Sequence, residues 1–397
     1  MIMHPATLPP EVFLPDYGGG SIVNLMASIA YAVGVADVNS VPLRDPELSA
    51  LLAERRRIVL FVVDGMGYKR LATTARGALR THLRGCLTSV FPSTTATAIT
   101  TFLTGLAPAQ HALTGWHMWF AQHATVGAIL PFRTRVSDRP LSALGIDPAA
   151  LFDHRSFFER LPVRSYAVAP ERIVGSAYNR AHCIGAQSYP YSSLEQLFGV
   201  TLNCLRATPE RCYIYAYYAD YDSIAHEYGV DSRHAARTLQ RFDDAFAAFL
   251  TAAAGLDVTV LVTADHGFID SPAARIVDLD RHRTLQKMLS APLCGERRAA
   301  YCYVRPECIE TFEQYVAREL SDQAWLHHSK TLIEHGWFGP GAPHPALAQR
   351  IGDYTLVMKD NWTIKEWLPG EQRHRQIGVH GGVSEDEMTV PLVVAQL

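Results

Sequence analysis

Short runs dominated by apolar residues, without regular polar alternation, recur through the first two thirds of the chain. Five of them are rich in β-branched and aromatic side chains: residues 58–63, 86–91, 165–169, 212–218 and 258–263. Such runs indicate strands that are buried on both faces, as in a parallel sheet. Between them lie segments with helical spacing, for example residues 232–253, whose apolar stripe is Leu239, Phe242, Phe246, Phe249 and Leu250. This alternation predicts an α/β fold with a doubly wound, mostly parallel sheet.

The pattern changes after Ser271. Residues 272–375 contain isolated strand-like runs, one helical segment at 308–320 and connections rich in Gly and Pro. We interpret this region as a smaller α+β cap that is inserted into the main domain. The core then comprises residues 1–271 and 376–397, and the last apolar run, 390–395, returns the chain to the core sheet.

Acidic and histidine side chains follow three of the predicted strands. Asp64 comes after the first strand, Asp222 and His226 after the fourth, and Asp265 and His266 after the fifth. Ligands of doubly wound sheets bind beyond the carboxyl ends of the strands, so these positions define a candidate site. An Asp-x-x-x-His spacing is weak by itself in a chain with 17 histidines, whereas the adjacent Asp-His pair is harder to explain by packing.

Thr95 lies in a hydroxyl-rich turn that follows the second predicted strand and opens into a helix. The helix shows apolar residues at Ile99 and Leu103, and Gly105 stands where a C-terminal cap is expected. A helix N-terminus carries unpaired N–H groups and partial positive charge, which favour a lowered hydroxyl pKa and a bound phosphate. Thr95 is therefore a candidate nucleophile, although Ser/Thr clusters before helices are also ordinary caps.

A late histidine, His380 in His-Gly-Gly, completes the set of candidate metal ligands. The set contains oxygen and nitrogen donors but no thiolate, which suits zinc or another divalent first-row ion. Its members are Asp64, Asp222, His226, Asp265, His266 and His380. Two ions about 4 Å apart would suit phosphoryl transfer to a hydroxyl such as that of Thr95.

As an ordered set, these motifs resemble the type I phosphodiesterase/nucleotide pyrophosphatase family of the alkaline phosphatase superfamily. The resemblance covers residues 58–117, 213–229, 260–267 and 380–382. It implies two metal ions, most simply Zn²⁺ with Mn²⁺ or Fe as alternatives. One ion would be held by Asp64, Thr95, Asp265 and His266, and the other by Asp222, His226 and His380. It also implies attack of Thr95 on phosphorus, a phosphothreonine intermediate and hydrolysis by water.

One position departs from the family pattern. The nucleotide pyrophosphatases carry an asparagine shortly after the Thr-Gly motif that binds a phosphate oxygen, whereas this chain has Trp116. The Trp116 indole can donate one hydrogen bond, or its ring can pack or support a substrate ring. The leading hypothesis is a phosphodiesterase or nucleotide pyrophosphatase. A phosphomonoesterase or phosphonate hydrolase in the same site is the alternative, and a phosphomutase or a non-catalytic binding protein is less favoured.

Composition limits the classes of partner and the cellular compartment that we expect for this protein. A net charge of −3 gives no electrostatic reason to expect nucleic acid or an anionic membrane, so the expected partner is a small phosphorylated substrate such as a nucleotide. Seven scattered cysteines without a C-x-x-C pair indicate a reducing compartment. Residues 1–15 lack the pattern of a secretory signal, and the longest apolar segment, 22–33, is too short to cross a bilayer. We therefore expect a cytoplasmic protein.

Overall fold

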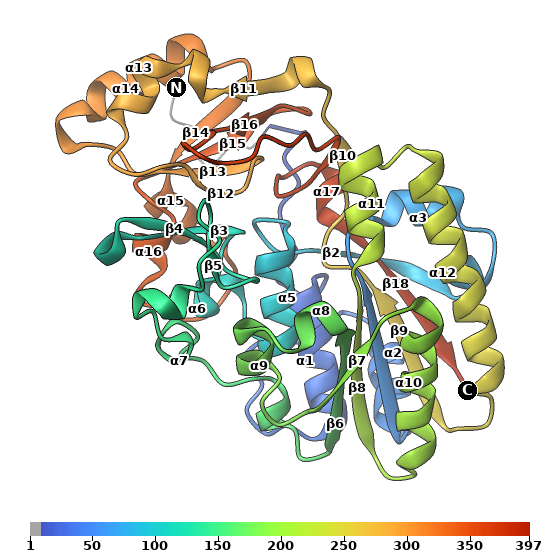
Figure 1. The fold of residues 1–397 in the computed structure, drawn as a ribbon. Helices are drawn as coiled ribbons and strands as arrows, with labels where there is room; N and C mark the ends of the chain where they lie inside the picture. The colour runs from blue at the N-terminus through green and yellow to red at the C-terminus, as the bar shows by residue number, and fades with distance from the viewer. Residues whose placement is uncertain (1–8) are drawn as a thin grey trace.

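The structure, a computed structural model, describes residues 9–397. Its larger lobe is built on a seven-stranded sheet (Figure 1). The strand order is β2 (Leu83–Thr88), β18 (Thr389–Gln396), β9 (Val258–Thr263), β1 (Arg57–Val63), β8 (Cys212–Tyr218), β6 (Arg164–Pro170) and β7 (Gln187–Tyr191). All neighbouring strands from β9 to β7 are parallel, and β18 is antiparallel to both β9 and β2. The predicted α/β class with a mostly parallel sheet is confirmed.

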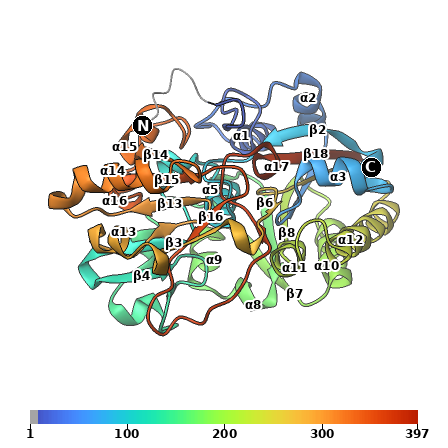
Figure 2. The ribbon, with the colours of Figure 1, turned by 90° about the horizontal axis from the view of Figure 1, so that it is seen from above.

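Helices cover both faces of this sheet (Figures 1 and 2). One face carries α10 (Leu194–Ala207) and α12 (Arg233–Ala252), and the other carries α1 (Ile22–Val33), α5 (Thr95–Thr104) and α9 (Ala177–His182). Helix α1 coincides with the apolar segment 22–33 and ends at Gly34, whose φ of 89° is the left-handed conformation that glycine adopts without strain. Helix α12 begins after Ser232, whose hydroxyl accepts a hydrogen bond from the N–H of Ala235 (3.1 Å).

Strand β2 lies three residues earlier than the predicted run 86–91. Its ladder with β18 extends from Leu83 to Thr88, so Val90 and Phe91 leave the sheet. The Phe91 ring packs instead against Trp337, with ring centroids 5.0 Å apart. Val90 packs in the core of the larger lobe, and the apolar character of Phe91 reflects packing between the two lobes. The sequence pattern cannot distinguish either case from burial in a strand.

The smaller lobe is built on a second sheet of seven strands, which we call the cap sheet. Its order is β14 (Ala324–His328), β15 (Tyr354–Met358), β13 (Ala299–Cys302), β12 (Cys294–Gly295), β3 (His117–Phe120), β4 (Thr125–Ala128) and β5 (Arg133–Thr134). Its pairs are antiparallel. Strands β3 to β5 come from residues 117–134, which lie outside the predicted insertion 272–375. They join the cap sheet because His117 of β3 pairs with Gly295 of β12. Helices α13 (Arg283–Met288) and α14 (Ile309–Glu319) also belong to this lobe.

Two predictions concern membranes and targeting. Within residues 9–397, none of the helices has both the length and the apolar character needed to cross a bilayer. The expected lack of a secretory signal concerns residues 1–15, of which residues 1–8 lie outside the part of the chain that the structure describes.

Candidate active site

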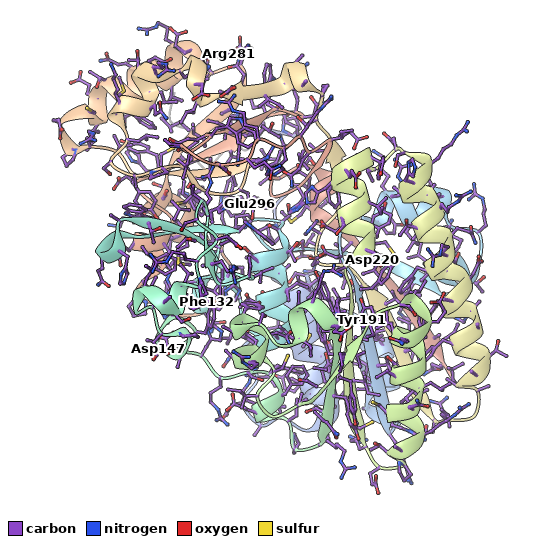
Figure 3. All side chains as sticks on the ribbon, in the orientation of Figure 1. Phe132, Asp147, Tyr191, Asp220, Arg281 and Glu296 are labelled. Carbon is purple, nitrogen blue, oxygen red and sulfur yellow. The ribbon has the colours of Figure 1, made fainter. Side chains whose placement is uncertain are left out.

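The seven residues predicted to bind metal come together at the carboxyl ends of the central strands. Asp64 follows β1, helix α11 (Asp220–Tyr228) follows β8, and the Asp265-His266 pair follows β9. These three strands are neighbours in the sheet. Asp222 and His226 lie one turn apart on α11, and Thr95 is the first residue of α5. His380 follows β17 (Gly378–Val379), which pairs with β10 (Ile269–Asp270) directly after the Asp-His pair. Figure 3 places Asp220 and Glu296 on the two sides of this region, where the lobes meet.

The first group of donor atoms surrounds the hydroxyl of Thr95. Thr95 Oγ1 lies 3.1 Å from His266 Nε2 and 3.4 Å from Asp64 Oδ1. His266 Nε2 lies 3.3 Å from Asp64 Oδ1 and 3.5 Å from Asp265 Oδ2. These four side chains are the ones that the family resemblance assigns to one ion.

The second group is formed by Asp222, His226 and His380. His226 Nε2 and His380 Nε2 are 3.2 Å apart. Asp222 Oδ1 lies 3.4 Å from His226 Nε2 and 3.8 Å from His380 Nε2. The rings of His266 and His380 are stacked with centroids 3.7 Å apart, so the two groups adjoin. The donor atoms of Asp222, His266 and His380 also lie within 4.8 Å of one another.

These separations fit divalent metal ions. Ligand atoms around a tetrahedral zinc with bonds of about 2.0–2.1 Å are about 3.3 Å apart. Two buried carboxylate oxygens, Asp222 Oδ1 and Asp265 Oδ2, have no hydrogen-bond partner among the described residues. A buried acceptor without a partner is costly, and both atoms point at the other donors of their groups. The residues present therefore fit bound divalent cations.

The three histidines are oriented in the same way. Each places Nδ1 near a backbone carbonyl oxygen: Gly378 for His226 (2.8 Å), Gly267 for His266 (3.0 Å) and Ser93 for His380 (3.3 Å). A proton on Nδ1 is held by that contact, and Nε2 is left as the free lone pair. All three Nε2 atoms lie at the shared centre of the site.

The burial of the cluster opposes ionised carboxylates. Burial raises the pKa of Asp222 to about 7 and that of Asp265 to about 8, and it raises the pKa of Asp64 well above its usual range. Burial also lowers the pKa of His226 to about 4 and that of His380 well below its usual range. A divalent cation reverses this balance, because it favours ionised carboxylates and needs neutral imidazoles.

The Asp-His-Gly turn is held by close backbone contacts. A Cβ atom on Gly267 would lie 2.0 Å from the carbonyl oxygen of Asp386, so only glycine fits at this position. Asp265 Oδ1 accepts hydrogen bonds from the N–H groups of Gly65 (2.9 Å) and His266 (3.0 Å). These bonds leave Oδ2 as the oxygen that faces the metal position.

The sequence analysis missed Glu296, which enters the site from the turn between β12 and β13 of the cap sheet. Its Oε1 accepts hydrogen bonds from Thr94 Oγ1 (2.7 Å) and from the backbone N–H of Trp116 (2.7 Å). Burial raises the pKa of the Glu296 carboxyl to about 7. No local motif marks this residue. The role of the Trp116 side chain, which is 37% exposed, in binding substrate stays a prediction.

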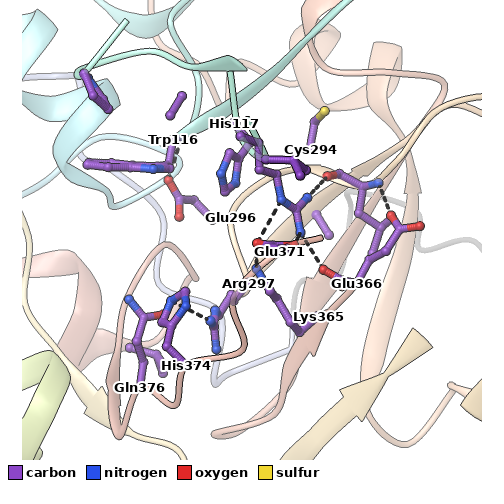
Figure 4. A pocket seen from close by; sticks show the side chains of 18 of the residues that line it. Trp116, His117, Cys294, Glu296, Arg297, Lys365, Glu366, Glu371, His374 and Gln376 are labelled. Atoms are coloured by element: carbon purple, nitrogen blue, oxygen red, sulfur yellow. Dashed lines mark hydrogen bonds and ion pairs between the residues drawn. The ribbon is translucent and has the colours of Figure 1, made fainter. Parts of the chain in front are cut away.

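Two cavities, each of about 540 Å³, meet at the candidate nucleophile. Both are lined by Thr95 and Trp116. The first, which Figure 4 shows, runs beneath the cap sheet and is lined by charged side chains, including Arg297 and Lys365. The second runs toward α8 (Glu171–Val174) and α9 and has apolar walls that include Ile99, Leu103, Leu130 and Ile173.

Comparison with known proteins supports the resemblance. The model of the family "Type I phosphodiesterase / nucleotide pyrophosphatase" matches residues 58–382. A search of curated protein sequences found no match.

Solved structures with the same fold include human ectonucleotide pyrophosphatase/phosphodiesterase 5. The two chains are 15% identical, with a TM-score of 0.63 over 85% of this chain and 87% of the human one. The murine enzyme, in an inactive form with AMP, is 16% identical, with a TM-score of 0.62 over 85% and 87%. Phosphonoacetate hydrolase from Sinorhizobium meliloti 1021 with phosphonoformate is 17% identical, with a TM-score of 0.65 over 86% and 90%.

At these identities the solved structures establish the fold. The family model covers most of the chain, and the predicted ligand residues lie together within the matched range. The chain therefore belongs to the type I phosphodiesterase/nucleotide pyrophosphatase family of the alkaline phosphatase superfamily and is a metal-dependent hydrolase acting on phosphoester bonds.

Proposed function

We propose that the protein is a two-metal phosphodiesterase or nucleotide pyrophosphatase that works through a covalent intermediate on Thr95. The observation that carries the proposal is the meeting of two large cavities at Thr95 and Trp116. A phosphodiester or phosphoanhydride has two substituents on the reacting phosphorus, and each cavity has room for one. A small phosphomonoester would use only one of them.

Most of the side chains at the site would bind metal ions, and Thr95 would also attack the substrate. Asp64, Asp265 and His266, with Thr95, would hold one zinc ion, and the three donors of the second group would hold the other. The bound ions supply Lewis-acid stabilisation of the charges on the attacking and leaving oxygens, and Mn²⁺ or Fe could do the same.

Thr95 Oγ1 attacks phosphorus, and the bond to the leaving oxygen breaks with its electron pair. Water then attacks phosphorus, the bond to Thr95 breaks, and the hydroxyl is restored. The position of Thr95 at the N-terminus of α5 favours its alkoxide and the anionic phosphoryl group. Glu296 links Thr94, the residue before the nucleophile, to the backbone of Trp116.

A phosphonate hydrolase is the second candidate. A solved relative binds phosphonoacetate, whose carboxylate would suit the charged cavity of this chain. That reaction cleaves a carbon–phosphorus bond instead of a phosphorus–oxygen bond. Release of inorganic phosphate from phosphonoacetate tests it directly.

The proposed function is tested by comparing two chromogenic substrates on zinc-reconstituted protein. We expect kcat/KM for bis(p-nitrophenyl) phosphate to be well above that for p-nitrophenyl phosphate. A ratio well below one would contradict the proposal and favour a monoesterase. The Thr95→Ala variant, prepared in the same way, serves as the control for contaminating phosphatases.

A further inference from the structure

Three cationic side chains line the first cavity in addition to Arg133, which pairs with Asp138 (2.8 Å). Arg135 follows β5, Arg297 lies between β12 and β13, and Lys365 belongs to β16 (Thr363–Lys365). Glu371 is the shared partner of two of them, because Arg135 Nη2 lies 2.9 Å from its Oε2 and Lys365 Nζ lies 3.0 Å from its Oε1. One carboxylate therefore serves two cations.

Arg297 has no carboxylate within 4.0 Å anywhere in residues 9–397. Its guanidinium lies 3.3 Å from His374 Nε2 (Figure 4) and 5.8 Å from the centre of the Trp367 ring. Two other glutamates line the cavity and have their own partners. Glu366 accepts hydrogen bonds from the backbone N–H of Leu293 (2.7 Å) and from a glutamine side chain, and Glu296 accepts from Thr94 and from the backbone of Trp116. The donors of Arg297 are thus available to a ligand in the cavity.

Burial and the positive charge of these side chains lower the pKa values of two neighbouring groups. Burial and then the guanidinium groups of Arg135 and Arg297 lower the pKa of Lys365 to about 8. The pKa of His117, across the cavity, lies well below its usual range for the same reasons, with burial as the largest and Lys365 as a further cause. Among the carboxylates that line this cavity, only Glu371 lies within 4.0 Å of any of these three cations in residues 9–397, so it is their one close counter-charge.

The three cations differ in how far the fold itself uses them. Arg135 also donates to the carbonyl oxygens of Leu293 (3.2 Å) and Glu366, so it links parts of the cap. Arg297 makes no such link to a backbone carbonyl in residues 9–397. A partly buried, unpaired guanidinium is costly for a fold, and an anionic ligand would remove that cost.

We propose that Arg297, Lys365 and His374 form an anion-binding subsite for a second anionic group of the substrate, a carboxylate or a phosphate. The inference rests on the proposed function and specifies its substrate class. One arm of the phosphodiester or anhydride ends in an anionic group and lies beneath the cap sheet. The other arm is apolar or aromatic and lies against the apolar walls of the second cavity.

The test uses three p-nitrophenyl phosphodiesters with the same leaving group and a methyl, carboxymethyl or phosphorylated ethyl group as the second arm. In the wild-type enzyme, we expect kcat/KM to be higher for an anionic arm than for methyl. In Arg297→Met, the ratio of kcat/KM for that anionic ester to the methyl ester should fall by about 10-fold or more, because charge-assisted hydrogen bonds are lost. Arg297→Lys keeps the charge and should retain most of the ratio. The anionic arm with the larger increase in kcat/KM over the methyl ester identifies the preferred group as a carboxylate or a phosphate.

Arg318→Met is the matched control, because the Arg318 guanidinium also lies 5.8 Å from an aromatic ring in the same lobe but outside the cavity. Its ratio should equal that of the wild type. A wild-type enzyme without preference for an anionic arm, or an unchanged ratio in Arg297→Met, would overturn the subsite and leave the phosphodiesterase proposal intact. A wild-type enzyme that hydrolyses none of the three esters would overturn both.

Discussion

A buried ion pair between Arg298 and Glu387 connects the cap to the turn that carries His380. Both side chains are almost fully buried, with exposed fractions of 1% and 0%. Arg298 donates from Nε to Oε1 (3.0 Å) and from Nη2 to Oε2 (2.8 Å). Glu387 Oε1 also accepts the N–H of Gly382 (2.8 Å), and the carbonyl oxygen of Gly382 accepts from Ser93 Oγ (2.8 Å). The pair therefore supports His380 and the loop before the nucleophile.

We predict that Glu387→Gln lowers the free energy of unfolding by about 3–5 kcal/mol, because it leaves the Arg298 guanidinium buried without a counter-charge. Urea titrations of metal-loaded protein measure this loss. The metal content should fall as well, because the Gly382 contact orients the His380 turn. Glu334→Gln is the control. Its ion pair with Lys330 is exposed, so the change should stay below about 1 kcal/mol.

The double variant Arg298→Met/Glu387→Gln separates this explanation from simple loss of packing. Removing the unpaired guanidinium should restore at least about 1 kcal/mol relative to Glu387→Gln alone. Additive losses in the double variant, or a loss below about 1 kcal/mol in Glu387→Gln, would refute the reasoning.

Three further predictions concern the site. Thr95→Ala should fold normally but lose turnover, whereas Thr97→Val should keep it, because the Thr97 hydroxyl is buried without a hydrogen-bond partner in residues 9–397. Normal turnover in Thr95→Ala would show that the nucleophile is another group. His380→Ala should lower the metal content to about one ion per chain, measured by elemental analysis, and the exposed His335→Ala should leave it unchanged; two retained ions would contradict the second metal site. The folded-state pKa of Asp265 is raised to about 8, so its contribution to stability is lost as the pH rises through 8. The Tm of metal-free protein should therefore fall from pH 6.5 to 8.5, and the Tm of metal-loaded protein should fall less; equal slopes would contradict this sign.

The sequence predicted the central strands and the clustering of the candidate ligands for the same reason. Strands β1, β8 and β9 are buried on both faces, so their apolar runs are continuous and their ends are marked by the first polar residues. In a parallel sheet those ends meet at one edge, which brings Asp64, Asp222 and Asp265 together. Local pattern and tertiary position agree at these elements.

Other parts of the fold and of the candidate site form only through contacts between segments that are distant in the sequence. Strands β3, β4 and β5 have two to four residues each, too few for a period to appear, and they join the cap sheet through a single pairing of His117 with Gly295. Glu296 and Arg297 resemble surface charges in the sequence, and only the hairpin between β12 and β13 carries them into the cavity. Their roles could not be predicted from local sequence.

The central claim is that Thr95 becomes covalently bonded to phosphorus during turnover. The most direct measurement is to quench the zinc-reconstituted enzyme with acid during hydrolysis of bis(p-nitrophenyl) phosphate and to map the modified peptide by mass spectrometry. We predict a phosphorylated or aryl-phosphorylated peptide in which Thr95 carries the modification, and no such peptide from Thr95→Ala. An adduct on another residue, or turnover with inversion of configuration at phosphorus, would contradict the account.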